Sequence, residues 1–384
     1  MRRSFSMRDV VAPLRELGLG LRDELRGCTG RHPRNVRALR QVASVALAVT
    51  ACHALQLADS WWAAISAFTV MQASWRTTLE RAGLRVLGTT AGALLGWMLG
   101  PLLLPHAGAF VLAVALVAWF SLYRALAFAH GYAWVLALVT FVMVACEARA
   151  VDVATLTGFA RERVVGVALG SLACVVVAAA ADMLGSRLLS PKPKPEPCVP
   201  AFTDAAALRR SAAQIAMHGA FAVAVLALVS TLAELRHFAQ AMVTTVAVLV
   251  VPMEGLGADP RRHVTGRMVQ RVAGCLLALV LAASVLPWVQ GRPLGAQVAL
   301  ATGVWCAAWL QEGVPAVRYM AVQFGVAFIM VFVQDRGWSA GDAPVLQRMG
   351  GMLVGIAVLA LSTGAIAAGR ALWFAGRTRA RRGR

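Results

Sequence analysis

The sequence predicts an all-α integral membrane protein of about twelve transmembrane helices. Of its 384 residues, 59% are hydrophobic and only 14% are charged, whereas soluble domains are roughly 45–50% apolar and about 25% charged. Apolar runs of roughly 17 to 25 residues, the length that crosses a bilayer, recur from Val42 to Trp373. This composition excludes a soluble enzyme.

Twelve apolar segments can be placed along the chain. They fall at residues 36–58, 60–75, 83–104, 107–123, 127–147 and 163–184, and then at 206–232, 237–252, 268–289, 294–311, 315–334 and 345–373. The second and eighth segments are short for a membrane span, and we expect them to form short or tilted helices.

Polar segments flank and divide these spans. Residues 1–35 lack the apolar core of a signal peptide, and Val10, Leu14 and Leu17 recur there at helical spacing. This pattern predicts an amphipathic helix on the membrane surface. The proline-rich residues 185–205 predict an extended linker between a first six-helix repeat at 36–184 and a second at 206–373. Residues 374–384 form a basic tail.

The positive charge indicates topology. A formal net charge of +19 would suggest nucleic acid binding in a soluble protein, but here the basic residues lie at the ends of apolar segments. With the N-terminus inside, they concentrate in the inward loops and tails. The positive-inside rule therefore places both termini in the cytoplasm and the chain in the inner membrane. We expect the lipid bilayer, and no nucleic acid, as its partner.

The two halves of the chain match each other. The segment Arg85-Val-Leu-Gly88 recurs about 186 positions later as Arg271-Val-Ala-Gly274. Matches at almost the same offset relate Arg76, Arg81, Tyr132, Phe141, Arg163, Gly166 and Gly170 to Arg262, Arg267, Tyr319, Phe328, Arg348, Gly351 and Gly355. Because each half holds an even number of spans, the repeats should be parallel, with a central pathway between them.

Four arginines are candidates for binding an anion. A carboxylate crossing lipid needs a compensating cation, which arginine provides with two parallel hydrogen bonds. Arg85 and Arg271 begin the third and ninth spans, where the alternative is an interface anchor reaching lipid phosphates. Arg163 and Arg348 begin the sixth and twelfth spans on the outer side, where basic residues are scarce. Pairing with Glu162 or Asp342 is the alternative for these two.

Aromatic residues and carboxylates complete the candidate site. Tyr132, Tyr319, Trp61 and Trp62 could stack on an aromatic substrate, or could belong to the aromatic belts of the membrane interface. The candidates for proton coupling are Glu147, Glu80 and Glu312, with His53 and His130 beside them. For Glu147 the alternative is an exposed loop carboxylate.

Other chemistry lacks sequence support. The chain has no Walker lysine motif, no paired aspartate cluster and no HExxH, and its seven cysteines have no metal-like spacing. We therefore expect no enzymatic activity, no cofactor and no metal. Gly88, Gly92, Gly96 and Gly100 repeat every fourth residue, which predicts a small face for close helix contact rather than a site.

One segment carries a family resemblance. An apolar helix that opens with Trp61 and ends near Gln72 is followed by a basic turn and by an Arg-x-x-Gly-Thr-x-x-Gly helix, from Arg85 to Gly92. This arrangement resembles the fusaric acid resistance protein-like family of the aromatic acid exporter superfamily, which also includes plant aluminium-activated malate transporters. The resemblance covers residues 36–184 well and residues 206–373 more weakly, because Phe238-Ala-Gln240 stands where the first half has its tryptophan pair.

The resemblance implies export of small organic anions, particularly aromatic carboxylates, often driven by proton influx. A periplasmic adaptor protein is a candidate partner. Two alternatives stay open: a passive organic-anion channel of the malate transporter type, and a membrane scaffold or enzyme without a transport role.

Overall fold

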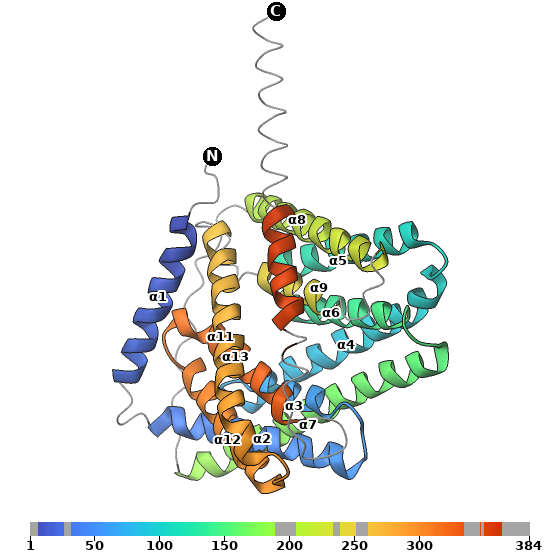
Figure 1. Cartoon of the computed structure of the whole chain (residues 1–384). Coiled ribbons are helices and arrows are strands. Elements are labelled where there is room, and N and C mark those ends of the chain that lie inside the picture. The colour runs from blue at the N-terminus through green and yellow to red at the C-terminus, as the bar shows by residue number, and fades with distance from the viewer. Residues whose placement is uncertain are drawn as a thin grey trace, which may run out of the picture.

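The computed structural model describes residues 7–26, 32–188, 205–232, 239–250, 260–333, 346 and 349–362. Within these ranges the chain is helical and contains no strand (Figure 1). The first half has α1 (Met7–Arg26), α2 (His32–Ala54), α3 (Ser60–Val70), α4 (Trp75–Leu103), α5 (Ala107–Ala127), α6 (Gly131–Glu147) and α7 (Val153–Leu188). The second half has α8 (Ala205–Leu232), α9 (Ala239–Leu249), α11 (Pro260–Val289), α12 (Pro293–Gln311), α13 (Pro315–Phe332) and the helix Met349–Ser362.

The predicted all-α membrane class is confirmed, and each of the twelve predicted apolar segments coincides with a helix. Among the described residues, seven helices are long and apolar enough to cross a membrane, namely α4, α5, α7, α8, α11, α12 and α13. The apolar helices α6, α9 and Met349–Ser362 are shorter. The count of twelve spans stays a prediction, because α3 has only 11 residues and the first turns of α2 carry Arg34, Arg37 and Arg40.

Large apolar side chains on the outer surface fit a lipid environment. Leu87 and Leu102 on α4 are 67% and 71% exposed, and Leu112 on α5 is 60% exposed. A soluble protein would place such residues against its core. These outward apolar faces and the long apolar helices describe a multi-pass membrane protein.

Several helices begin earlier than the apolar pattern predicts, because their first turns are polar. α4 starts at Trp75 rather than at residue 83, since the Ser74 hydroxyl accepts a hydrogen bond from the Thr77 backbone amide in a capping box. α7 starts at Val153 rather than at residue 163, and Asp152 accepts bonds from the backbone amides of Ala154 and Thr155. Polar helical turns of this kind carry no hydropathy signal.

The glycine face of α4 packs directly on α6, as its spacing predicts. A Cβ at Gly88 would lie 2.3 Å from the carbonyl oxygen of Ala133, and one at Gly92 would lie 2.2 Å from that of Ala137. Both distances are far below van der Waals contact, so only glycine allows the two backbones to approach this closely.

Helices of the two halves pack on each other in a reciprocal way. α2 of the first half packs on α12 of the second, and α8 of the second half packs on α5 of the first. In the same manner α3 contacts α13, where the ring of Phe68 lies against Gly325, and α9 contacts α6. Figure 1 shows α8 lying across α5 at one end of the molecule and α12 beside α2 at the other.

The N-terminal helix α1 packs on α11 and α13 (Figure 1). Its buried Leu17 contacts Val317 and Met320 on α13. The carboxylate of Glu24, only 2% exposed, accepts a hydrogen bond of 2.9 Å from the backbone amide of Val314. α1 therefore holds the first turn of α13 in place.

Some predicted features lie outside the described residues. They are most of the linker at 185–205, the whole tail at 374–384, Arg348, and Asp342, its proposed alternative partner.

Candidate functional site

Arg85, Ser66 and Tyr132 form a buried polar group where α3, α4 and α6 meet. Arg85 is 6% exposed. Its Nε donates a hydrogen bond of 3.0 Å to the Ser66 hydroxyl, and its Nη1 donates one of 2.8 Å to the Tyr132 hydroxyl. The close approach of α4 and α6 at Gly88 and Gly92 brings Tyr132 within reach of Arg85. Two candidates from different spans are thus in direct contact.

A second arginine completes this group. The Arg81 guanidinium lies 4.2 Å from the centre of the Tyr132 ring, within the range of a cation–π interaction. Arg81 is one helical turn before Arg85, so both face α6. We call Arg81, Arg85, Ser66 and Tyr132 the first cluster.

The second half builds a matching group. Arg271, 2% exposed, donates from Nη1 to the Tyr319 hydroxyl at 3.4 Å and to Gln323 Oε1 at 2.7 Å. Its Nη2 donates to the Thr244 hydroxyl at 3.2 Å. The Arg267 guanidinium lies 4.6 Å from the Tyr319 ring centre. We call Arg267, Arg271, Tyr319, Thr244 and Gln323 the second cluster.

The contacts around the clusters repeat in both halves. A Cβ at Gly274 would lie 2.4 Å from the carbonyl oxygen of Met320, just as one at Gly88 would meet Ala133. A Cβ at Gly170 or Gly355 would meet the carbonyl oxygen of Ala63 or Ala241. The residues that match in sequence therefore make matching contacts. The two halves differ at one position. Counting back from the matching Phe141 and Phe328, the residue that corresponds to Gln323 in the second half is Leu136 in the first.

Within the part of the chain that the structure describes, no carboxylate forms an ion pair with the arginines of either cluster. The ion pairs among the described residues are Arg34 with Glu24, Arg37 with Glu312, and Arg40 with Asp182. The guanidinium groups of the clusters are instead held by neutral hydroxyl, amide, aromatic and backbone carbonyl groups, the last of these being the carbonyl oxygens of Ala247 and Val250, to which Arg267 donates. Two positive charges beside a tyrosine, with no ion pair to a described carboxylate, make each cluster attractive to a carboxylate substrate.

Arg163 lies in a separate aromatic site. It is 1% exposed, and its guanidinium stacks on the Trp62 ring at 3.6 Å and lies 5.2 Å from the Phe159 ring. Its Nη2 contacts the thioether sulfur of Met143 at 2.9 Å. Trp61 packs on Trp62, and its Nε1 donates to Asp59 at 3.3 Å. Trp62 therefore contacts Arg163 directly, whereas Trp61 packs on the Trp62 ring.

Arg348 lies outside the described residues, but the two glycines that follow it, Gly351 and Gly355, are described. Gly351 and Gly355 lie against Gln240 and Ala241, as Gly166 and Gly170 lie against Trp62 and Ala63. Gln240 thus stands in the position of Trp62. The aromatic stack on Arg163 belongs to the first half.

The proton-coupling candidates lie in three different settings. Glu80 is exposed on α4, and Glu312 pairs with Arg37 at 2.5 Å at the end of α12. Glu147 is the last residue of α6, partly buried and one turn after Met143. Of the three, Glu147 is the one that lies a helical turn from a residue, Met143, in contact with the candidate Arg163. Among the described residues no group of three or more His, Cys, Asp or Glu side chains is arranged to hold a metal ion.

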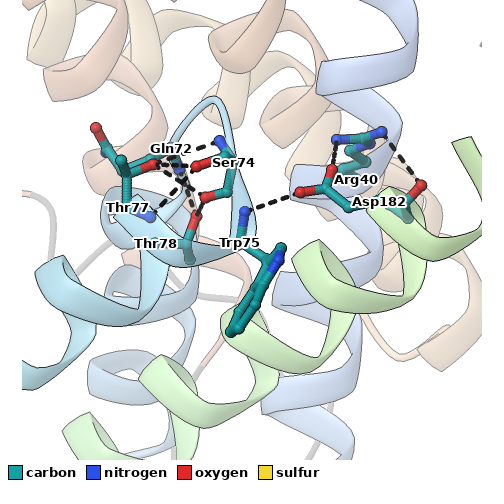
Figure 2. Close-up of polar contacts among 8 residues, drawn as sticks. Arg40, Gln72, Ser74, Trp75, Thr77, Thr78 and Asp182 are labelled. Atoms are coloured by element: carbon teal, nitrogen blue, oxygen red, sulfur yellow. Dashed lines mark hydrogen bonds and ion pairs between the residues drawn. The ribbon is translucent and has the colours of Figure 1, made fainter. Parts of the chain in front are cut away.

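A surface network fixes the start of α4. Figure 2 shows Asp182 between Arg40, which it meets at 3.1 Å, and the backbone amide of Trp75, which donates to it at 2.9 Å. This carboxylate ties α2 and α4 to α7. Trp75 and Asp182, with Ala179 and Met183, line a surface pocket of about 260 Å³. Both oxygens of the Asp182 carboxylate are engaged in these bonds, so we interpret the network as structural.

Sequence reasoning missed five members of the clusters as site residues. Arg81 and Arg267 recur in both halves, and this recurrence could have singled them out. Ser66 and Thr244 are small hydroxyl residues in apolar helices and carry no sequence signal of their own. Gln323, a polar side chain inside the apolar α13, was a visible signal.

Comparison with known proteins adds one match. Neither the search of curated proteins nor the search of solved structures gave a match. A family description, fusaric acid resistance protein-like, matches residues 47–178, from α2 to α7. This region contains the first cluster, Trp62 and Arg163. The resemblance predicted from Trp61 to Gly92 is therefore confirmed: residues 47–178 are similar to the fusaric acid resistance protein-like family.

Proposed function

We propose that this protein exports small organic anions across the inner membrane, that its substrates are aromatic carboxylic acids, and that proton influx drives the export. The observation that carries the proposal is the occurrence of two buried arginine–tyrosine–arginine clusters whose guanidinium groups contact no carboxylate of the described residues. A buried arginine is costly unless an anion or several acceptors compensate it. The presence of two such clusters inside an apolar helix bundle supports the binding of an anion that moves through the protein.

The proposed architecture is two parallel six-helix repeats of twelve spans in all, around a central pathway. The reciprocal packing of α2 on α12 and of α8 on α5 supports it, as does that of α3 on α13 and of α9 on α6. A pseudo-twofold axis along the membrane normal would relate both pairs. The clusters lie beside α3 and α9, which contact α13 and α6 of the opposite half.

With both tails in the cytoplasm, the clusters fall toward the inner side and Arg163 toward the outer side. Ser66 and Trp62 are one turn apart on α3, and they contact Arg85 and Arg163 respectively. Two successive turns of α3 therefore each contact a buried arginine of another helix. An anion would move from the first cluster to Arg163, with its ring beside Trp62. The proposal assigns no catalysis to this chain and leaves a periplasmic adaptor as a partner to be sought.

Growth in the presence of toxic acids tests the substrate class. Cells lacking the protein and cells overproducing it are compared on hydroxybenzoates, pyridine carboxylates and aliphatic dicarboxylates. The proposal predicts a shift in the toxic concentration of the aromatic acids only. No shift for any acid would contradict a role in export, and a shift confined to the dicarboxylates would contradict the aromatic class.

Inside-out vesicles test the coupling. Export appears there as uptake, which should collapse when the proton gradient is dissipated. Uptake that instead follows the electrochemical gradient of the anion alone would identify a passive channel.

A further inference from the structure

Arg163 is the most poorly compensated buried charge in the described part of the chain. Its Nη1 is buried without a hydrogen-bond partner, and its Nη2 contacts only a thioether. A thioether sulfur is a weak acceptor, and stacking on Trp62 replaces only part of the lost hydration. A site of this kind favours the arrival of an anion at Nη1.

Two carboxylates act on Arg163 electrostatically without forming an ion pair with it. They are Asp59, before α3, and Glu147, at the end of α6. Asp59 is hydrogen-bonded by Trp61, which restrains it. Glu147 is one turn after Met143, the residue that Arg163 now contacts, so both lie on the side of α6 that faces Arg163.

The other charged groups near this pair are cationic. Arg85 on α4 acts on Arg163, and Arg149, whose guanidinium lies over the Phe110 ring, follows Glu147 by two residues. Glu162, next to Arg163 on α7, is partly exposed. Glu147 is therefore the carboxylate that acts on Arg163 and that forms no ion pair or side-chain hydrogen bond within the described residues.

We propose that Glu147 competes with the transported anion for Arg163, and so releases the anion at the outer end of the pathway. The inference rests on the proposed function, since it concerns the same anion. One guanidinium cannot satisfy two carboxylates in the same bidentate geometry. An ionised Glu147 displaces the anion, and a protonated Glu147 leaves Arg163 to it.

The sign of the pH effect follows. Protonation of Glu147 and binding of the anion to Arg163 favour each other, because each prevents the ion pair between ionised Glu147 and Arg163. The site should therefore hold the anion more tightly at low pH and release it more readily at neutral pH. Glu147 acts here as a release group. Proton antiport would need the opposite relation at this residue, binding of the proton at the expense of the anion.

Calorimetric titration of the purified full-length protein tests the inference. At neutral pH the probe is benzoate. Glu147→Gln should bind it about tenfold more tightly than the parent protein, a change of about 1.4 kcal/mol. Glu162→Gln, the matched control on α7, should bind like the parent. Glu147→Ala provides the same comparison if the amide variant does not fold, as judged by thermal unfolding.

A pH series gives a second readout. Benzenesulfonate is the probe here, because it stays ionised from about pH 4 to about pH 8, the range in which glutamate carboxyl groups titrate. Its affinity for the parent protein should fall as the pH rises, and this dependence should disappear in Glu147→Gln and in Arg163→Gln.

The outcomes separate the two proposals. Equal benzoate affinity in the parent and in Glu147→Gln, with an unchanged pH dependence, would overturn the inference and leave the proposed function intact. Failure of the parent protein to bind either probe would contradict the proposed function itself. A dependence that disappears in Glu162→Gln instead would transfer the release role to that residue and overturn the assignment to Glu147.

Discussion

The Arg85 guanidinium donates a hydrogen bond of 2.8 Å to the Tyr132 hydroxyl, across 47 residues of sequence. Arg271 and Tyr319, separated by 48 residues, make the corresponding contact at 3.4 Å. The chain has only three tyrosines, and two of them hold these arginines. The same pairing in both halves indicates that the orientation of the guanidinium, and not its charge alone, matters in this protein.

Tyr132→Phe should weaken anion binding while the protein stays folded. Hydrogen bonds to charged groups contribute roughly 1.5–3 kcal/mol, and loss of the hydroxyl leaves Arg85 held by Ser66 alone. We expect a KM for anion transport raised about tenfold or more. The third tyrosine provides the control, since Tyr123 stacks on Trp119 away from the cluster. An unchanged KM in Tyr132→Phe, measured beside Tyr123→Phe, would show that Tyr132 does not orient the arginine.

Gly88→Ala should destabilise the protein, because the new methyl group would overlap the Ala133 carbonyl oxygen. Overpacking of this kind costs roughly 1–3 kcal/mol. The same substitution at Gly83, on the same helix, meets no atom within 4 Å. There it should be neutral or stabilising by up to about 1 kcal/mol, from helix propensity. Thermal unfolding of both variants in one detergent decides the matter, and equal melting temperatures would refute the packing argument.

Glu24→Ala should release α1 from α13. The substitution removes the carboxylate that accepts from Val314 and pairs with Arg34 at 2.5 Å, at a cost of roughly 1–3 kcal/mol. Trypsin should then cleave within α1 faster than in the parent protein. Asp23→Ala, an exposed change one residue earlier, should leave the cleavage rate unaltered. Equal protection of all three proteins would mean that Leu17 and its apolar contacts suffice to hold α1.

Asp152 should stabilise the start of α7 in a pH-dependent way. Hydrogen bonds from Thr155, through its hydroxyl at 2.6 Å and its backbone amide, lower the pKa of the Asp152 carboxyl below its ordinary value. A lowered pKa in the folded state means stability that is present above the unfolded pKa, about 3.9, and that is lost as the pH falls below it. Asn at this position caps the helix without titrating.

The melting temperature of the parent protein should therefore fall more steeply than that of Asp152→Asn as the pH drops from about 5 to about 3. Parallel curves would show that the carboxylate contributes nothing at this helix start. Thr157→Ala, further along α7, serves as the control for a general change in that helix.

The sequence predicted the helical membrane class because a bilayer imposes a long, continuous hydropathy signal. It also singled out Arg85, Tyr132, Arg271 and Tyr319 through their recurrence at nearly one offset, although it did not predict that each arginine contacts the tyrosine of its own half. The glycine face of α4 packs as its four-residue spacing predicts. Periodicity and recurrence carried these predictions.

Hydropathy could not reveal the helical turns outside the apolar segments. The start of α4 at Trp75 depends on a cap at Ser74, and α1 docks on α13 through the buried carboxylate of Glu24 as well as through Leu17. Nor could the sequence show that Trp62 stacks on Arg163 whereas Trp61 binds Asp59. Adjacent residues on a helix point in directions about 100° apart, so which of them meets α7 is decided by tertiary packing.

The most direct test of the account is efflux of benzoate from vesicles that contain the purified protein, measured for the parent, Arg85→Gln, Arg85→Lys and Arg76→Gln. Arg85→Gln removes the charge, Arg85→Lys keeps the charge but loses the planar fork, and Arg76 stacks on Trp75 outside the cluster. The account predicts that Arg85→Gln abolishes efflux, that Arg85→Lys retains a small part of it, and that Arg76→Gln behaves as the parent does. Efflux at the parental rate in Arg85→Gln, with equal amounts of folded protein, would contradict the assignment of the clusters as anion sites.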